Sequence, residues 1–150
     1  MNDTGVPARP AAARSGTSTG RRLRRLAGTG LAATFAAVLV TTVAAAVARV
    51  VGVDFEVSAD GEAIPLAGFA VVTGFFSIIG VVLAAAILLW SARPAERFVW
   101  TAASLTVVSL VPPFLVEADV ATTVALLGLH IVPAAVMIPA LAWSLRTRTD

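Results

Sequence analysis

The sequence predicts an all-α membrane protein, a bundle of four transmembrane helices joined by short loops, and three observations lead to this prediction. First, 58% of the residues are hydrophobic and only 13% are charged, and a soluble domain of this size has too much surface to hide so large an apolar fraction. Second, the apolar residues form long runs that approach or exceed the roughly 20 residues needed to cross a bilayer. Third, no run has a polar stripe at the helical period.

The predicted organisation is a membrane domain between two tails. Residues 1–26 are rich in Pro, Ala, Ser, Thr, Gly and Arg and have little to bury, which is typical of a disordered basic tail. Residues 146–150 form a second tail. The membrane domain, residues 27–145, contains the predicted spans 27–51, 67–90, 98–116 and 122–145.

The arginines predict the orientation of these spans. All of the 11 basic residues are arginine, and all except Arg49 lie in the two tails or in the connection 91–97. Alternating spans place them on one side, which the positive-inside rule makes cytoplasmic. Arg49 lies near the opposite face, where its side chain can snorkel outward. Trp90, Trp100 and Trp143 lie at the headgroup level of the arginine side. We therefore expect a multi-pass protein of the bacterial cytoplasmic membrane with both termini in the cytoplasm.

A cleaved signal peptide is a second interpretation of the first span. Basic residues precede the apolar run, and Ala46-Val47-Ala48 fits the small-residue pattern of a cleavage site. The run is longer than the usual apolar region of a signal peptide, which favours an uncleaved span. Cleavage leaves three spans and does not move the other loops.

The connection 52–66 is acidic and alternates apolar and polar residues in Val53-Asp54-Phe55-Glu56-Val57. Asp60-Gly61 follows, a dipeptide that favours the turn of a β-hairpin. We expect a short β-hairpin on the outer membrane surface, and the alternative is a disordered acidic loop.

A cluster of arginines directly before the first span is expected to contact anionic lipid headgroups. Each arginine near an anionic leaflet contributes about 1 kcal/mol of attraction. The pI near 11.0 would suggest nucleic acid in a soluble protein, but here topology and lipid explain the charge, and we expect no nucleic-acid partner. The cluster consists of Arg21, Arg22, Arg24 and Arg25.

His130 is the only histidine and the one readily titratable side chain well inside a predicted span. Counting inward from the outer ends of the other spans places several hydroxyl groups at a similar depth. The resulting polar layer is either a proton or ligand site or a packing contact in which a neutral histidine bonds to serine or threonine. Packing is favoured, because no carboxylate shares this depth. The layer consists of His130, Ser109, Ser77, Thr41 and Thr42.

Prolines and small residues mark the later spans. Four prolines interrupt the backbone hydrogen-bond ladder and predict kinks, although the carbonyls that they free could instead bind a cation or water. Small residues along one side of the second span allow a neighbouring helix to approach closely. The prolines are Pro112, Pro113, Pro133 and Pro139, and the small residues are Gly74, Ser77, Gly80 and Ala84.

Chemistry of several kinds is not indicated. The chain has no cysteine, so disulfides, thiolate metal sites and cysteine nucleophiles are excluded. The sequence has no phosphate loop, nucleophile elbow, HExxH motif or dinucleotide fingerprint. We expect no enzyme activity, no metal site and no cofactor.

Several short motifs are characteristic of one group of proteins. They are the arginine-rich start, Val53-Asp54-Phe55-Glu56-Val57, Trp100 followed by Ser109-Leu110-Val111-Pro112, and Leu129-His130 with Ile138-Pro139. On these motifs, over about residues 22–145, the chain resembles a family of small four-span membrane proteins of actinobacteria whose function is unknown. Some of its members are labelled cell-envelope biogenesis proteins, and the resemblance implies no activity, ligand or catalytic residue.

Two functional classes fit these observations. In the first, the chain is a structural or interaction protein of the cell envelope that engages lipid and a second copy of itself or another membrane protein. In the second, it is a small transporter or channel subunit that uses the layer around His130. The scarcity of polar groups inside the spans favours the first.

Overall fold

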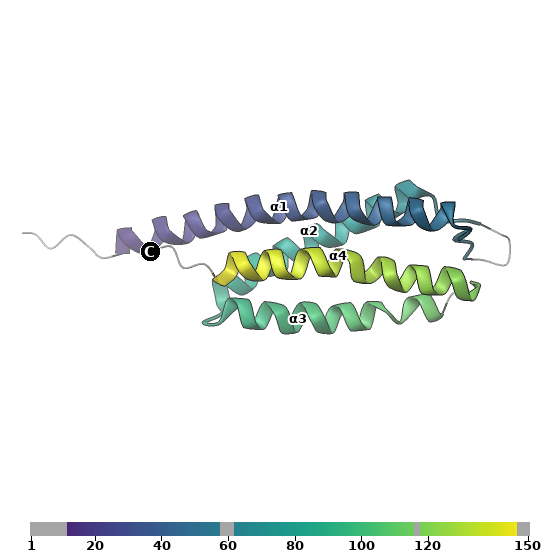
Figure 1. Ribbon diagram of the computed structural model, residues 1–150. Coiled ribbons are helices and arrows are strands. Elements are labelled where there is room, and N and C mark those ends of the chain that lie inside the picture. Colours follow the sequence, from purple (N-terminus) through teal and green to yellow (C-terminus); the bar gives the residue numbers. More distant parts are fainter. Residues whose placement is uncertain (1–11, 58–61, 116–117, 147–150) are drawn as a thin grey trace, which may run out of the picture.

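The computed structural model describes residues 12–57, 62–115 and 118–146, which form an up-down-up-down bundle of four α-helices (Figure 1). Helix α1 packs against α2 and α4, and α3 packs mainly against α4. Figure 1 shows α1 and α3 on opposite sides of the bundle. The elements are α1 (Ala12–Val50), α2 (Leu66–Trp90), α3 (Pro94–Ser109), the 3₁₀ helix η1 (Pro112–Phe114) and α4 (Val120–Arg146).

The predicted fold class is confirmed. Four helical segments in the described part of the chain are long and apolar enough to cross a membrane. The second and fourth, Leu66–Trp90 and Val120–Arg146, begin and end within two residues of the predicted spans. The first and third, Ser18–Val50 and Pro94–Phe114, begin earlier than predicted.

The predicted disorder of residues 1–26 is wrong for residues 12–26, which are the first turns of α1; residues 1–11 lie outside the described residues. Disorder was predicted because this segment has few apolar residues to bury. Once an apolar span has nucleated a helix, however, each further residue adds a hydrogen bond at little cost, and alanine and arginine are good helix formers. As a result α1 extends past the other three helices at one end of the bundle (Figure 1).

Helix α3 is short because prolines limit it. Pro94 occupies its first turn, where a missing N–H costs nothing. The 16 residues of α3 cover about 24 Å at 1.5 Å per residue, less than the roughly 30 Å of hydrocarbon in a bilayer. Pro112 and Pro113 cannot donate to a continuing ladder, so the α-helix ends at Ser109 and η1 completes the span. The expected kink at these two prolines is therefore a helix terminus.

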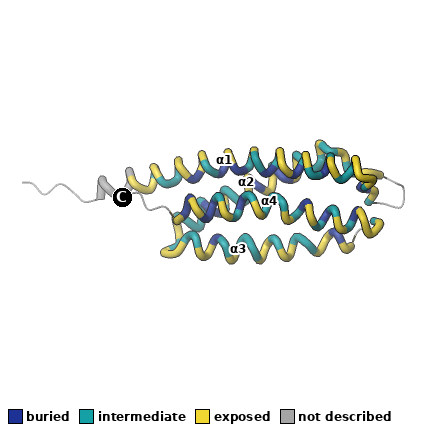
Figure 2. Tube along the Cα trace, in the orientation of Figure 1, coloured by how far each residue is buried: buried dark blue, intermediate teal, exposed yellow. Residues whose placement is uncertain are grey.

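Small side chains line the contact between α1 and α2. Ala33, Ala37 and Ala84 are buried, and a Cβ atom added to Gly30 would lie 2.6 Å from a methyl carbon of Val81. Lipid is as apolar as the helix surfaces, so the helices associate through close van der Waals packing. Figure 2 shows the buried segments facing the centre of the bundle and the exposed ones facing outward.

Candidate functional site

His130 lies on α4, in the half of the helix that begins at Val120. Its neighbour Leu129 packs in a buried cluster with Ala45 of α1, so the imidazole is close in level to Thr41 and Thr42. The Nδ1–H donates to the carbonyl oxygen of Leu126 at 2.9 Å, because a carbonyl can only accept. The packing interpretation expected a hydrogen bond from the imidazole to a serine or threonine. The described hydrogen bond instead joins the imidazole to the backbone of its own helix.

The hydroxyls of the predicted layer divide into two groups. Thr42 donates to the carbonyl of Val38 at 2.8 Å, and Ser109 donates to the carbonyl of Thr106 at 2.7 Å. Thr41 is only 1% exposed, and its Oγ1 has no hydrogen-bond partner among the residues that the structure describes. Ser77 is also buried. Side-chain hydrogen bonds across helices do not join these groups within the described residues.

The predicted depth of Ser77 is wrong. Gly30 faces Val81, and Gly74 faces Val38, so the antiparallel register places Ser77 level with Thr34 and not with Thr41. Counting from helix ends assumed that all ends share one level. By this register the start of α2 lies about one helical turn further from the acidic loop than the end of α1 does. Ser77 therefore lies closer to the centre of the bundle.

The predicted kinks in α4 are not tested by these contacts. Pro133 and Pro139 lie inside α4, which continues through both.

Gly74 and Ala84 of the small-residue stripe face other helices, but a Cβ atom at Gly80 would meet nothing within 4 Å. The stripe thus supports close packing at only some of its positions.

A buried phenylalanine caps the bundle beyond His130. Phe55 comes from the α1–α2 connection, is 0% exposed, and packs edge-on against Phe69 of α2 with ring centroids 4.9 Å apart. Its φ is +56°, a left-handed conformation that non-glycine residues rarely adopt. Such strain persists only where surrounding contacts hold it. The acidic neighbours Asp54 and Glu56 are exposed.

The connection that carries Phe55 folds back on itself. Glu56 and Ala63 form an isolated antiparallel bridge, and the Ile64 N–H donates to the Phe55 carbonyl at 3.1 Å. The expected hairpin is reduced to this bridge, with no strand in the described residues, and the predicted Asp60-Gly61 turn lies outside them. Arg49 donates through Nη2 to the carbonyl of Ile64, so its guanidinium anchors the connection.

This end of the bundle also carries Asp119, the residue directly before α4. Its Oδ1 accepts from the Thr122 N–H at 2.8 Å, an N-cap contact that satisfies an otherwise free donor. Hydrogen bonds from the Thr122 side chain and backbone lower the pKa of Asp119 below its ordinary value. We call this end, with Asp54, Glu56, Glu62 and Asp119, the acidic end.

The opposite end, which we call the arginine end, carries Arg21, Arg22, Arg24 and Arg25 of α1, Arg93 and Arg97 near the start of α3, and Arg146 of α4. The guanidinium of Arg25 lies over the Trp143 ring, 5.4 Å from its centroid, and joins α1 to α4. Trp90 and Trp100 are also at this end and exposed.

The α2–α3 turn fixes the position of Arg93. Ser91 ends α2, and its N–H donates to the carbonyl of Ile87 at 3.0 Å. The Ser91 Oγ accepts from the Arg93 N–H at 3.2 Å. Pro94 then starts α3 and disfavours the helical conformation for the residue before it; Arg93 has φ −126° and ψ 67°.

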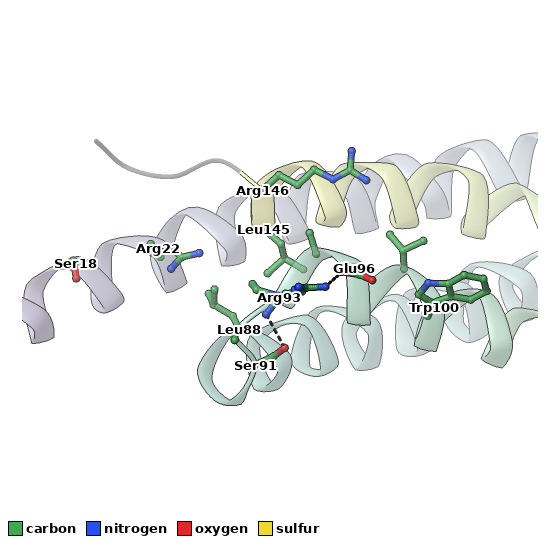
Figure 3. Close-up of a pocket in the computed structure, with 13 residues that line it drawn as sticks. Ser18, Arg22, Leu88, Ser91, Arg93, Glu96, Trp100, Leu145 and Arg146 are labelled. Carbon is green, nitrogen blue, oxygen red and sulfur yellow. Dashed lines mark hydrogen bonds and ion pairs between the residues drawn. The ribbon is translucent and has the colours of Figure 1, made fainter.

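A pocket of about 790 Å³ opens at the arginine end between α1, the α2–α3 turn and the end of α4. Figure 3 shows Arg93 beside Glu96 in the pocket, with Arg22 on α1 and Arg146 on α4 at its edges. The Arg93 and Glu96 side chains pair at 3.6 Å. A smaller pocket of about 510 Å³ shares Arg93, Glu96 and Trp100 with it. His130 lines neither pocket.

The sequence did not predict this pocket. Arg22 was expected to contact lipid headgroups, but Arg93 and Arg146 were used only to orient the spans. Three segments far apart in the chain meet here, and a residue pattern within any one of them carries no sign of the others. The one available signal was that the arginines of all three segments were predicted to lie on the same side of the membrane.

Four apolar helices, a small-residue interface and two oppositely charged ends define the class as a multi-pass membrane protein. The sequence pattern of DUF6069, a family of unknown function, matches residues 21–147. The chain therefore belongs to this family. No curated protein and no solved structure matches the chain.

Proposed function

We propose that this chain is a structural or interaction protein of the cell envelope that works through its outward-facing surface. The observation that carries the proposal is the distribution of side-chain size. Ala33, Ala37 and Thr41 of α1 are buried, whereas Phe35, Phe75 and Phe76 are exposed on α1 and α2. Small residues inside leave the large apolar side chains to meet lipid or another transmembrane helix.

The polar groups support the same proposal over a transporter. His130, Thr42 and Ser109 each bond to a carbonyl of their own helix, which occupies hydrogen-bonding capacity that a transported ion would need. Phe55 lies over the acidic end of the bundle. No catalytic step or cofactor is part of the proposal.

We propose that the arginine end faces the cytoplasm, so both termini are cytoplasmic and the membrane is the bacterial cytoplasmic membrane. The positive-inside bias supports this orientation, because Arg49 is the one arginine at the acidic end among the described residues. The arginines of α1 then lie where an anionic leaflet attracts them.

Cysteine labelling tests this orientation. The chain has no cysteine, so Asp54→Cys and Ala92→Cys each create a unique thiol at an exposed position. We expect a membrane-impermeant maleimide to label Asp54→Cys in intact cells stripped of their outer layers, and Ala92→Cys only after lysis. Labelling of Ala92→Cys alone in the intact cells would contradict the proposed orientation.

Reconstitution tests the structural role against transport. We expect proteoliposomes to show the same proton and cation leak with and without the wild-type protein between pH 5.5 and about 7.5, a range of about one unit either side of the ordinary histidine pKa. We expect His130→Ala to lower the free energy of unfolding in mild detergent by about 0.5–1 kcal/mol, the typical contribution of a membrane hydrogen bond.

Thr42→Val is the matched control. Thr42 also donates to a carbonyl of its own helix, and valine has nearly the same side-chain shape as threonine. Both variants should shift only stability. A protein-dependent, pH-dependent flux that His130→Ala abolishes and Thr42→Val preserves would replace the structural proposal with the transport one.

A further inference from the structure

We infer that the pocket between Arg22, Arg93 and Arg146 binds the phosphodiester headgroup of an anionic phospholipid. This inference rests on the proposed function in one respect, that the chain lies in a bilayer with the arginine end at the headgroup level. It goes beyond a diffuse attraction between basic residues and a leaflet, because it assigns one lipid to one site built by three segments.

Charge is the first argument. Arg22 and Arg146 have no acidic partner among the residues that the structure describes, where the Arg93–Glu96 ion pair is the one described salt bridge. That pair is highly exposed, with side chains 79% and 59% accessible, and exposed pairs of this kind contribute little. Arg93 is therefore free to turn to an anion. Three arginines and one glutamate leave the pocket with excess positive charge.

Backbone donors are the second argument. The first described helical bond of α3 runs from the Arg97 N–H to the Arg93 carbonyl at 3.2 Å, and no side chain caps the helix start. The N–H groups of Ala95 and Glu96 precede that bond and have no intrahelical acceptor. Both residues line the pocket. Donors at a helix start, added to guanidinium groups, suit the oxygens of a phosphate.

The pocket wall favours a lipid over a free anion. Leu88, Val99 and Trp100 line the same space as the arginines, and Trp100 is 71% exposed at the end of a membrane span. A ligand that fits both surfaces has an anionic group joined to an apolar body. The pocket volume of about 790 Å³ lies in the range of small-ligand sites. Basic pockets between helices at this level bind lipid headgroups in other membrane proteins.

Native mass spectrometry of the full chain in mild detergent tests the site, with phosphatidylglycerol added as the probe and phosphatidylcholine as the zwitterionic control. We expect one tightly retained phosphatidylglycerol per chain and no comparable retention of phosphatidylcholine. The double variant Arg93→Gln/Arg146→Gln should weaken phosphatidylglycerol binding about 30-fold, because each arginine contributes about 1 kcal/mol and 1.4 kcal/mol corresponds to tenfold.

Arg21→Gln/Arg24→Gln is the matched control. It removes the same charge from the same end, at exposed positions outside the pocket lining, and we expect less than about a threefold change. Trp100→Ala should weaken lipid binding severalfold and leave any binding of inorganic phosphate unchanged. The substituted residues are exposed, so all variants should keep the thermal stability of the wild type.

Three results would overturn the inference. In the first, the control double variant weakens binding as much as the pocket variant, which indicates diffuse attraction. In the second, phosphatidylcholine is retained equally well. In the third, inorganic phosphate displaces the lipid at equal concentration, which identifies a free-anion site. None of these results changes the expected labelling pattern or the absence of flux, so the site can fail while the proposed function stands.

Discussion

Replacing Phe55 by alanine is expected to lower the free energy of unfolding by about 3–5 kcal/mol, the range for truncating a buried phenylalanine. Phe55 is 0% exposed and packs with Ala45, Leu126 and Leu129 at the acidic end. Unlike a side chain inside a span, it reaches its site from a connection outside the lipid. Its burial therefore removes apolar surface from water and keeps the full transfer contribution. Thermal or chemical unfolding in mild detergent measures the change.

The conformation of Phe55 gives this prediction an internal check. Its φ of +56° costs an L-residue about 1–2 kcal/mol, and glycine pays none of this cost. Alanine loses the side chain and keeps the strain, so Phe55→Gly should be less destabilised than Phe55→Ala, the reverse of the usual order. If Phe55→Ala lowered the free energy of unfolding by less than about 1 kcal/mol, the packing of Phe55 would not stabilise the acidic end of the bundle.

Hydropathy predicted the four spans because lipid imposes one simple requirement, an uncharged run of sufficient length. The ends of α2 and α4 were predicted to within two residues because Pro65, Ser91 and Asp119 interrupt the pattern there. The start of α1 was missed for the opposite reason. Residues 12–26 are not a continuous apolar run. Their helix continues from the first span, and hydropathy does not detect such a polar extension.

The candidate sites were harder to predict, because they depend on relative position between helices. Counting from the helix ends placed His130 near Thr41 and Thr42 but put Ser77 at the wrong level. The contacts of Gly30 with Val81 and of Gly74 with Val38 give a register of α1 and α2 that the helix ends do not reveal. The left-handed conformation of Phe55 had no signal in its residue type. In the arginine pocket, the sequence predicted positive charge on one side of the membrane. That the three segments carrying Arg22, Arg93 and Arg146 border one pocket depends on how the helices pack, which the sequence did not predict.

Replacing Gly30 by alanine is expected to lower the free energy of unfolding by about 1–3 kcal/mol, the cost of overpacking a close contact. The new Cβ atom would lie 2.6 Å and 2.8 Å from the two methyl carbons of Val81. Valine has one strongly preferred rotamer in a helix, so it cannot turn both methyls away, and α1 and α2 must separate. Unfolding in mild detergent again measures the change.

Gly28→Ala is the matched control, because the same substitution two residues away meets nothing within 4 Å. It should raise the free energy of unfolding by up to about 1 kcal/mol, since alanine is the better helix former. If steric contact with Val81 causes the loss, Val81→Ala in the Gly30→Ala background should restore most of it, a coupling that a double-mutant cycle isolates. Equal effects at Gly28 and Gly30, or no coupling to Val81, would mean that small residues do not set the distance between α1 and α2. One of the two contacts that place Ser77 level with Thr34 would then lose its support, and the register would depend on the contact of Gly74 with Val38.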